Sequence, residues 1–268
     1  MSAEPSIDAI LRWRGAASFA WMTALLAWES SRPCHDWFRS WRHRGRHAVI
    51  NLALALGNVL LVALLFTSLW RWFADLTAAR NLGLLNTIPM TGWARTLATL
   101  LLLDLWTYGW HRACHRIPLL WRFHRVHHSD AAMDVTTANR FHAGEILLSG
   151  LLRLLLIPAL GIRFQDLVVY ETILQVCVQW HHANIRLSEP WERRLRQWVV
   201  TPGLHQVHHS REQPQTDSNY ASVLPVWDRI FRSLKLHAHP EAIRIGQDGL
   251  DAPAQQTLSA LVGQPFRR

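Results

Sequence analysis

The feature that most constrains this chain is an uncharged apolar run from Ala48 to Trp70. At about 1.5 Å per residue, a helix over this run is long enough to cross a hydrocarbon core of about 30 Å. A bilayer core offers no water to backbone N–H and C=O groups, so a segment that crosses it must satisfy them within a helix. The run therefore predicts a membrane-spanning helix.

A second apolar segment lies nearer the N-terminus, from Gly15 to Trp28. It is short for a span, so it crosses the membrane only if its helix begins earlier, near Ile7. In that case Arg12 and Arg14 would have to reach back to the polar interface. We treat it as a conditional span.

Three later segments are also apolar. Thr96 to Trp110 carries Asp104 as its one acidic residue and leads directly into a histidine motif. Ile146 to Ile162 and Leu167 to Trp180 are each marginal as full spans. We expect these last two to form a helical hairpin that enters and leaves by one face, so that the residues before and after it meet.

These segments predict the all-α class: an integral-membrane helical bundle of about three to five membrane helices, with a cytosolic, histidine-rich helical cap. We expect residues 1–110 to hold the N-terminal membrane helices. Residues 111–268 would then form a histidine-rich catalytic region, with the membrane hairpin at 146–180 followed by the cap.

The charge pattern predicts the orientation in the membrane. The loop from Ser31 to His47 contains five arginines, which the positive-inside rule assigns to the cytoplasm. Two crossings later, the histidine motifs return to that side, and the polar, proline-broken stretch from Ile185 onward fits a cytosolic cap. We expect a bacterial inner membrane.

The formal charge of +9 does not indicate nucleic-acid binding, because the arginines flank apolar segments and form no recognition stripe.

Eight of the sixteen histidines fall into three tight clusters. The clusters are HRACH (His111, His115), HRVHH (His124, His127, His128) and HQVHH (His205, His208, His209). Residues at i, i+3 and i+4 share one face of a helix, so we expect each cluster to aim its imidazoles at a common point. This spacing is typical of metal ligands.

Three further histidines flank the hairpin, His142 before it and His181 and His182 after it. His142 is either a ligand, a group that pairs with Glu145 to support a ligand, or an interfacial bystander. His182 is the better candidate ligand of the adjacent pair. The isolated histidines are expected to be ordinary core or surface residues; they are His35, His43, His47, His237 and His239.

The number of imidazoles indicates two metal ions, because eight or more exceed what one tetrahedral zinc can use. Imidazole suits iron, copper, nickel or zinc. The three cysteines contain no CxxC pair, so a thiolate site is not indicated. Beside membrane helices, such a centre would meet substrates that offer few reactive groups except C–H bonds.

The three motifs and their surroundings resemble the fatty acid hydroxylase and sterol desaturase superfamily. Its signature is an HxxxH, an HxxHH and a later HxxHH motif, and the similarity extends through HHSDAAMDVTTANRFH, HHANIRL, VTPGLHQVHHS and TDSNYASVLPVWDRIF. The resemblance implies that the eight motif histidines are metal ligands, and His182 matches the single histidine of the family's HAN element. His181 has no such counterpart.

The same resemblance implies two iron ions, with zinc as a possible substitute, and dioxygen as co-substrate. It also implies an external electron donor, such as a small ferredoxin or cytochrome, and a lipid-like substrate taken from among the membrane lipids. The products would be hydroxylated or desaturated fatty acids, sterols, carotenoids or related molecules. This chain departs from the family pattern at Ala143, Ala221 and Arg232, where proline, glycine and glycine are usual.

Two other classes remain open. A membrane zinc hydrolase would use a metal-bound water to attack a lipid ester or amide and would work without oxygen. A metal transporter would need ligands spaced through the membrane, whereas these gather beyond the helix ends.

The ligand count predicts about two transition-metal ions per chain in the purified active protein. Elemental analysis checks this. One ion or none in an active preparation would contradict it, whereas zinc in place of iron would leave the count intact, because imidazole sites also accept zinc.

Overall fold

The computed structural model describes residues 7–90 and 92–267. Over these residues the chain is helical, and the only β pairing is two isolated bridges, Pro33 with Ile185 and Ser210 with Ile245. The predicted all-α class is therefore confirmed.

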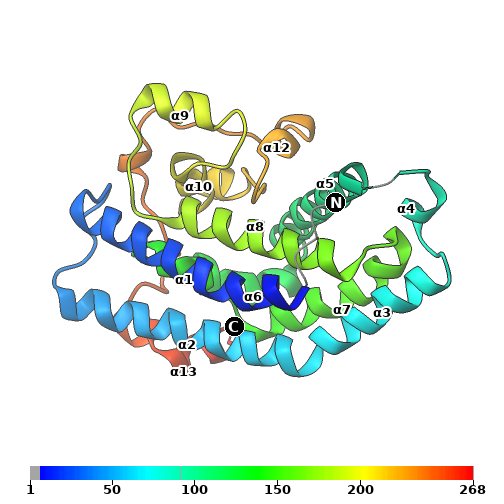
Figure 1. Ribbon diagram of the computed structural model, residues 1–268. Coiled ribbons are helices and arrows are strands. Elements are labelled where there is room, and N and C mark those ends of the chain that lie inside the picture. Colours follow the sequence, from blue (N-terminus) through cyan, green and yellow to red (C-terminus); the bar gives the residue numbers. More distant parts are fainter. Residues whose placement is uncertain (1–6, 91, 268) are drawn as a thin grey trace.

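Long helices form a bundle and shorter ones cover its sides (Figure 1). The long helices are α1 (Ile7–Ser31), α2 (Trp41–Leu65), α3 (Thr67–Ala79), α5 (Gly92–Arg116), α7 (Ala143–Leu160) and α8 (Phe164–His182). The shorter α-helices are α4 (Leu84–Thr87), α6 (Pro118–His128), α9 (Glu189–Leu195), α10 (Pro202–His208), α11 (Gln213–Thr216), α12 (Val226–Ile230) and α13 (Leu258–Gly263). The 3-10 turns are η1 (Val135–Asn139), η2 (Pro240–Ala242), η3 (Pro253–Gln256) and η4 (Gln264–Phe266).

Helix α8 is the central element, because it packs against α1, α5, η1 and α10. Helix α7 packs instead against α2 and α3. Helices α9, α10 and α12 lie on one side of α8, whereas α13 lies on the other side of the bundle, beside α2 (Figure 1). The cap therefore covers two faces of the bundle.

The expected single helix from Ala48 to Trp70 is wrong in its bounds. The helix starts seven residues earlier, at Trp41, and the chain bends at Phe66 between α2 and α3. The bend lets the Phe66 and Trp70 rings stack, with centroids 5.4 Å apart, and the Trp70 indole donates to the Gly150 carbonyl on α7. A Cβ on Gly150 would lie 2.6 Å from the Phe66 ring. Close packing against α7 thus explains a bend that hydropathy alone could not reveal.

The two segments of the predicted hairpin are present as α7 and α8, joined by a turn at Gly161. Gly161 has φ 76° and Gly83 has φ 93°, and a Cβ on Gly83 would lie 2.2 Å from the Gly161 nitrogen. Both positions need glycine, because the left-handed conformation and the close approach exclude a side chain. An Arg153–Glu171 ion pair at 2.8 Å links the two helices.

Two helices among the described residues, α2 and α7, are long and apolar enough to cross a membrane. Only 11% and 17% of their apolar windows are buried, unlike the core helices of a soluble protein. Large apolar side chains are also exposed on α3 and α5, including Leu69, Trp72, Trp93 and Leu97. This exposed apolar surface suits a membrane protein.

Helix α5 runs without a break through residue 110 into the first histidine motif, as its apolar segment predicted. Its buried Asp104 accepts hydrogen bonds from the Trp227 indole, at 2.7 Å, and from the Leu224 N–H, at 3.2 Å. Phe231 stacks on Tyr108 one turn later, with ring centroids 5.1 Å apart. These contacts fasten the α12 region of the cap to α5.

The three departures from the family pattern have different structural consequences. Ala143 is the first residue of α7, where proline is favoured but alanine also suits a helix. Ala221 is buried, with its N–H donating to Asp228, and does not have a positive φ. Arg232 has φ 57°, a left-handed conformation that glycine adopts at lower cost.

The predicted topology can be tested by cysteine labelling from outside intact cells. Ser129 and Ser210 directly follow two histidine motifs but are buried, so exposed positions must replace them. Gln213 is exposed at the start of α11, which packs against α10, and Arg80 is exposed directly after α3, at the end of the first predicted crossing. A membrane-impermeant reagent should label Arg80→Cys and leave Gln213→Cys unlabelled. Labelling of Gln213→Cys from outside would overturn the cytosolic assignment.

Candidate metal centre

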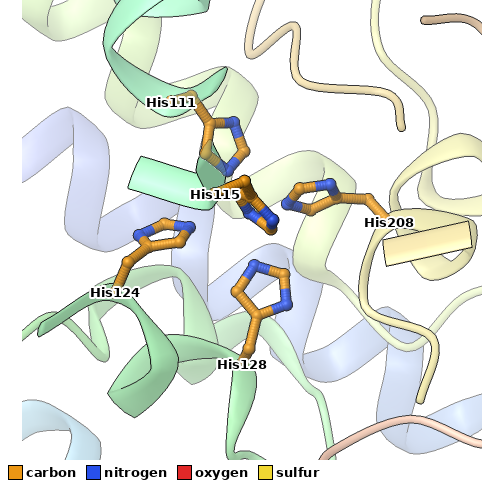
Figure 2. A group of neighbouring side chains, drawn as sticks. All are labelled: His111, His115, His124, His128 and His208. Carbon is orange, nitrogen blue, oxygen red and sulfur yellow. The ribbon is translucent and has the colours of Figure 1, made fainter. Parts of the chain in front are cut away.

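Four helices bring nine histidines together as two neighbouring groups. The first group draws on α5, α6 and α10, and its members are His111, His115, His124, His128 and His208 (Figure 2). The second group draws on α6, α8 and α10, and its members are His127, His182, His205 and His209. Within each group, one ring nitrogen of every histidine lies within 4.8 Å of the others.

Each HxxHH motif contributes to both groups. His127 and His128 are adjacent in sequence but point into different groups, and His208 and His209 do the same. Consecutive helical residues are about 100° apart around the axis, so neighbours diverge while i and i+4 converge. The expectation that a whole cluster shares one point was therefore wrong. The two groups still adjoin, since His128 stacks on His209 with centroids 4.4 Å apart.

The ring nitrogens of the second group approach one another closely. His182 Nε2 lies 3.1 Å from His127 Nε2 and 3.0 Å from His205 Nε2. The His205 and His209 Nε2 atoms are 3.1 Å apart. Two nitrogens bound to one ion at about 2.1 Å and at right angles are separated by about 3.0 Å. The spacing therefore fits a shared metal ion.

Backbone carbonyls orient several of these rings. His111 Nδ1 donates to the Tyr220 carbonyl at 2.7 Å, and His208 Nδ1 donates to the Ser218 carbonyl at 2.7 Å. His182 Nδ1 donates to the Val178 carbonyl at 2.8 Å. Each bond places the proton on Nδ1 and leaves the Nε2 lone pair free for a metal.

A carboxylate orients His124. Its Nδ1 lies 3.0 Å from both oxygens of Glu145, a residue of α7 that is 5% exposed. One of the alternatives for His142 was a pairing with Glu145, but Glu145 pairs with His124. Cys114, in the first motif, is buried with its Sγ 3.9 Å from Glu145. The hairpin helix α7 thus supports the centre through a carboxylate and supplies none of the nine histidines.

Eight of the nine histidines have lowered pKa values, which keeps them neutral. Burial, followed by repulsion from His124, lowers the pKa of His111 to about 3. Burial lowers the pKa of His182 to about 4, and for His128 and His208 burial and the neighbouring imidazoles lower the pKa well below its ordinary value. Neutral imidazole is the form that binds metal.

Several ring nitrogens are buried without any hydrogen-bond partner. They include both nitrogens of His115 and His128 and the Nε2 atoms of His124 and His208. An unsatisfied buried polar group costs about 1–3 kcal/mol. A set of such atoms converging on one volume, with every donor an imidazole, fits metal ions of the iron, copper, nickel or zinc kind.

Two of the expected site residues lie outside both groups. His142 caps α7: its Nδ1 accepts from the Gly144 N–H and its Nε2 donates to the Val262 carbonyl, so neither nitrogen is free for a metal. His181 is buried beside the second group, with its ring centroid 4.0 Å from that of His205. It adjoins the site without entering it.

A buried polar network beneath the second motif was not anticipated from the sequence. Asp130 lies 2.8 Å from His47 Nε2, and Arg140 donates to the Val126 carbonyl and to Asn51. Burial alone would raise the pKa of Asp130, but His47 and Arg140 hold it below its usual range. The charged residues within HHSDAAMDVTTANRFH, between two apolar segments, were the sequence signal that could have revealed this network.

None of the five isolated histidines, which were expected to be ordinary core or surface residues, belongs to either group.

Comparison with known proteins identifies the family. The family model described as fatty acid hydroxylase matches residues 96–233, just over half of the 268 residues. This region contains all nine histidines of the two groups. No solved structure matches the chain.

Three curated relatives illustrate the similarity. Alkylglycerol monooxygenase of Danio rerio is 32% identical over 134 residues, 48% of this chain and 28% of that protein. Ornithine lipid hydroxylase OlsE of Rhizobium tropici is 27% identical over 169 residues, 63% of this chain and 49% of that protein. The cholesterol 25-hydroxylase-like protein of Danio rerio is 29% identical over 188 residues, 68% of this chain and 70% of that protein.

The match to the first of these relatives thus spans little more than a quarter of its length. The similarity centres on the part of the chain that carries the two histidine groups. With just over half of its residues matching the family model, this chain belongs to the fatty acid hydroxylase family.

Proposed function

We propose that this chain is a membrane-bound oxidoreductase that uses dioxygen to hydroxylate or desaturate a lipid-like substrate at a non-haem di-iron centre. The observation that carries the proposal is the pair of adjoining histidine groups, five imidazoles in one and four in the other. The relatives' names support it, since they describe hydroxylases or monooxygenases. Alkylglycerols, ornithine lipids and cholesterol share a long apolar body, which a membrane-embedded bundle suits.

In this proposal the first group holds one iron ion and the second group holds the other. A bound iron pair supplies the Lewis acidity and redox capacity for oxidising a C–H bond with dioxygen. The chain's own residues prepare the site: Glu145 and the carbonyl of Tyr220 set the ring orientations, and burial keeps the imidazoles neutral. Ligands locked in this way lose little freedom when metal binds.

The surroundings of the centre would also exclude water. His205, His208 and His209 are each at most 2% exposed, and Phe141 stacks on His127 with ring centroids 4.4 Å apart. Exclusion of water prevents side reactions of a strong oxidant. Electrons would come from a small ferredoxin- or cytochrome-type protein on the cytosolic face of a bacterial inner membrane. A zinc hydrolase needs neither nine imidazoles nor electrons, so we do not favour that alternative.

Lipid analysis tests the reaction. Cells that make the protein should accumulate a lipid that is heavier by one oxygen atom or lighter by two hydrogen atoms, and growth without oxygen should abolish that product. Mass spectrometry of lipid extracts, with and without the protein, measures both outcomes. A product that forms equally well without oxygen would instead indicate hydrolysis.

Removing one ligand from each group tests the division into two ion sites. His208→Ala and His127→Ala should each abolish activity and lower the metal content from about two ions per chain to about one, because each group binds its own ion. His237→Ala is the matched control, since His237 lies outside both groups. All three variants should still insert, because insertion depends on the apolar helices. Equal losses in all three would show that histidines here support folding generally.

A further inference from the structure

The C-terminal segment from Leu258 to Phe266 lies outside the region that matches the family model. It forms α13 and η4 and carries three apolar side chains spaced four residues apart. Leu258, Val262 and Phe266 are 41%, 50% and 74% exposed. Residues four apart share a helical face, and Ala260 and Leu261 on the other face are buried. The segment is therefore amphipathic, with its apolar stripe turned away from the protein.

Helix α6 enlarges this surface. Phe266 lies against Phe123, with ring centroids 6.2 Å apart. Leu119 is 60% exposed and precedes Phe123 by one helical turn, so it shares its face. We call the surface formed by Leu119, Leu258, Val262 and Phe266 the C-terminal apolar patch.

The patch lies beside the start of α7 and beside the first turns of the uncharged part of α2, which begins at Ala48. The Val262 carbonyl accepts from His142 Nε2 at 3.1 Å, and His142 is the residue that caps the start of α7. Leu261 packs in one cluster with Leu54 and Ile50 of α2. The exposed apolar face of α2 starts at this height, with Val49 at 67% exposure.

The two segments that form the patch carry acidic residues at no position and arginines at several. Residues 116–128 and 252–268 contain arginines and no aspartate or glutamate. Arg122 and Arg267 are exposed at the edges of the patch. Arg125 holds the segment in place by donating to the carbonyls of Gln264 and Arg267. An apolar stripe bordered by arginines complements an anionic lipid surface.

We propose that the C-terminal segment is an interfacial anchor. The segment lies flat among the lipid headgroups at the point where α7 enters the membrane, and its C-terminal apolar patch inserts between those headgroups. The occupant of this surface is an anionic lipid leaflet. This inference rests on α2 and α7 spanning a membrane and is independent of the metal and the reaction.

The η3 turn, which directly precedes the anchor, also braces the second histidine motif. Gln256 Nε2 donates to the carbonyl of Ser129 at 2.9 Å, and Ser129 directly follows His128. Arg140 donates to Gln256 at 2.6 Å. Lipid binding by the segment would therefore hold α6 and its histidines at a set height above the membrane.

The test places an environment-sensitive fluorophore on single cysteines at Val262→Cys and Phe266→Cys, with Gln213→Cys as control. Gln213 is exposed and lies on α11, outside the C-terminal segment. Cys34 and Cys177 are first replaced by serine, whereas Cys114 is 0% exposed and stays. The labelled full-length protein is reconstituted in phosphatidylcholine vesicles with and without phosphatidylglycerol. Nitroxide-bearing lipids and aqueous iodide serve as quenchers.

We expect labels at 262 and 266 to show blue-shifted emission and several-fold stronger quenching by lipid nitroxide than the label at 213. Omitting phosphatidylglycerol should weaken that quenching, and an unchanged value would overturn the role of anionic lipid. Equal iodide quenching at all three positions would overturn the anchor, because the stripe would face water. Protection of 262 and 266 from both quenchers would also overturn it and would indicate a protein partner, such as a second copy.

Discussion

Burial of nine imidazoles around two points is the constraint on which the rest of the structure depends. Burial of each ring removes two polar nitrogens from water, and each nitrogen needs a compensating partner. Where the protein supplies that partner, it often uses a backbone carbonyl, such as those of Ser218, Tyr220 and Val178. In the first group the Nε2 atoms of His124 and His208 have no such partner, and in the second group the Nε2 atoms face one another at 3.0–3.1 Å. A bound metal ion would satisfy them, so metal binding and folding of this region should be coupled.

The scaffold meets this constraint by bringing distant parts of the chain together. Helix α5 delivers the first motif, and its Asp104 also fastens the cap, which carries the supporting carbonyls of Ser218 and Tyr220. Helix α8 delivers His182, and α7 supplies Glu145 to orient His124. Beneath the second motif, Arg140 joins α2, the end of α6 and the turn before the C-terminal segment through Asn51, Ser129 and Gln256. One buried guanidinium therefore couples the metal-site helices to the proposed anchor.

Hydrophobic and histidine patterns predicted much of this arrangement because both depend on local periodicity. An uncharged run long enough to cross a membrane identified α2, and two marginal apolar segments identified the α7 and α8 pair. The i, i+3 and i+4 spacing identified the eight motif histidines, and the family resemblance added His182. Local patterns did not predict the bend at Phe66, where contact with Gly150 decides the geometry. They also left the role of His142 open, since the choice of Glu145 between His124 and His142 depends on how α6 packs against α7.

The sequence by itself determined the helical class, the histidine inventory and the family, because these follow from residue identity and spacing along the chain. Only the tertiary structure decided which imidazole joins which group. Adjacent residues such as His127 and His128 diverge around a helix, and each finds its companions on helices far away in sequence. The same holds for the C-terminal segment. Its stripe of Leu258, Val262 and Phe266 could not be recognised as an anchor from the sequence, because only folding places it beside α2 and the start of α7.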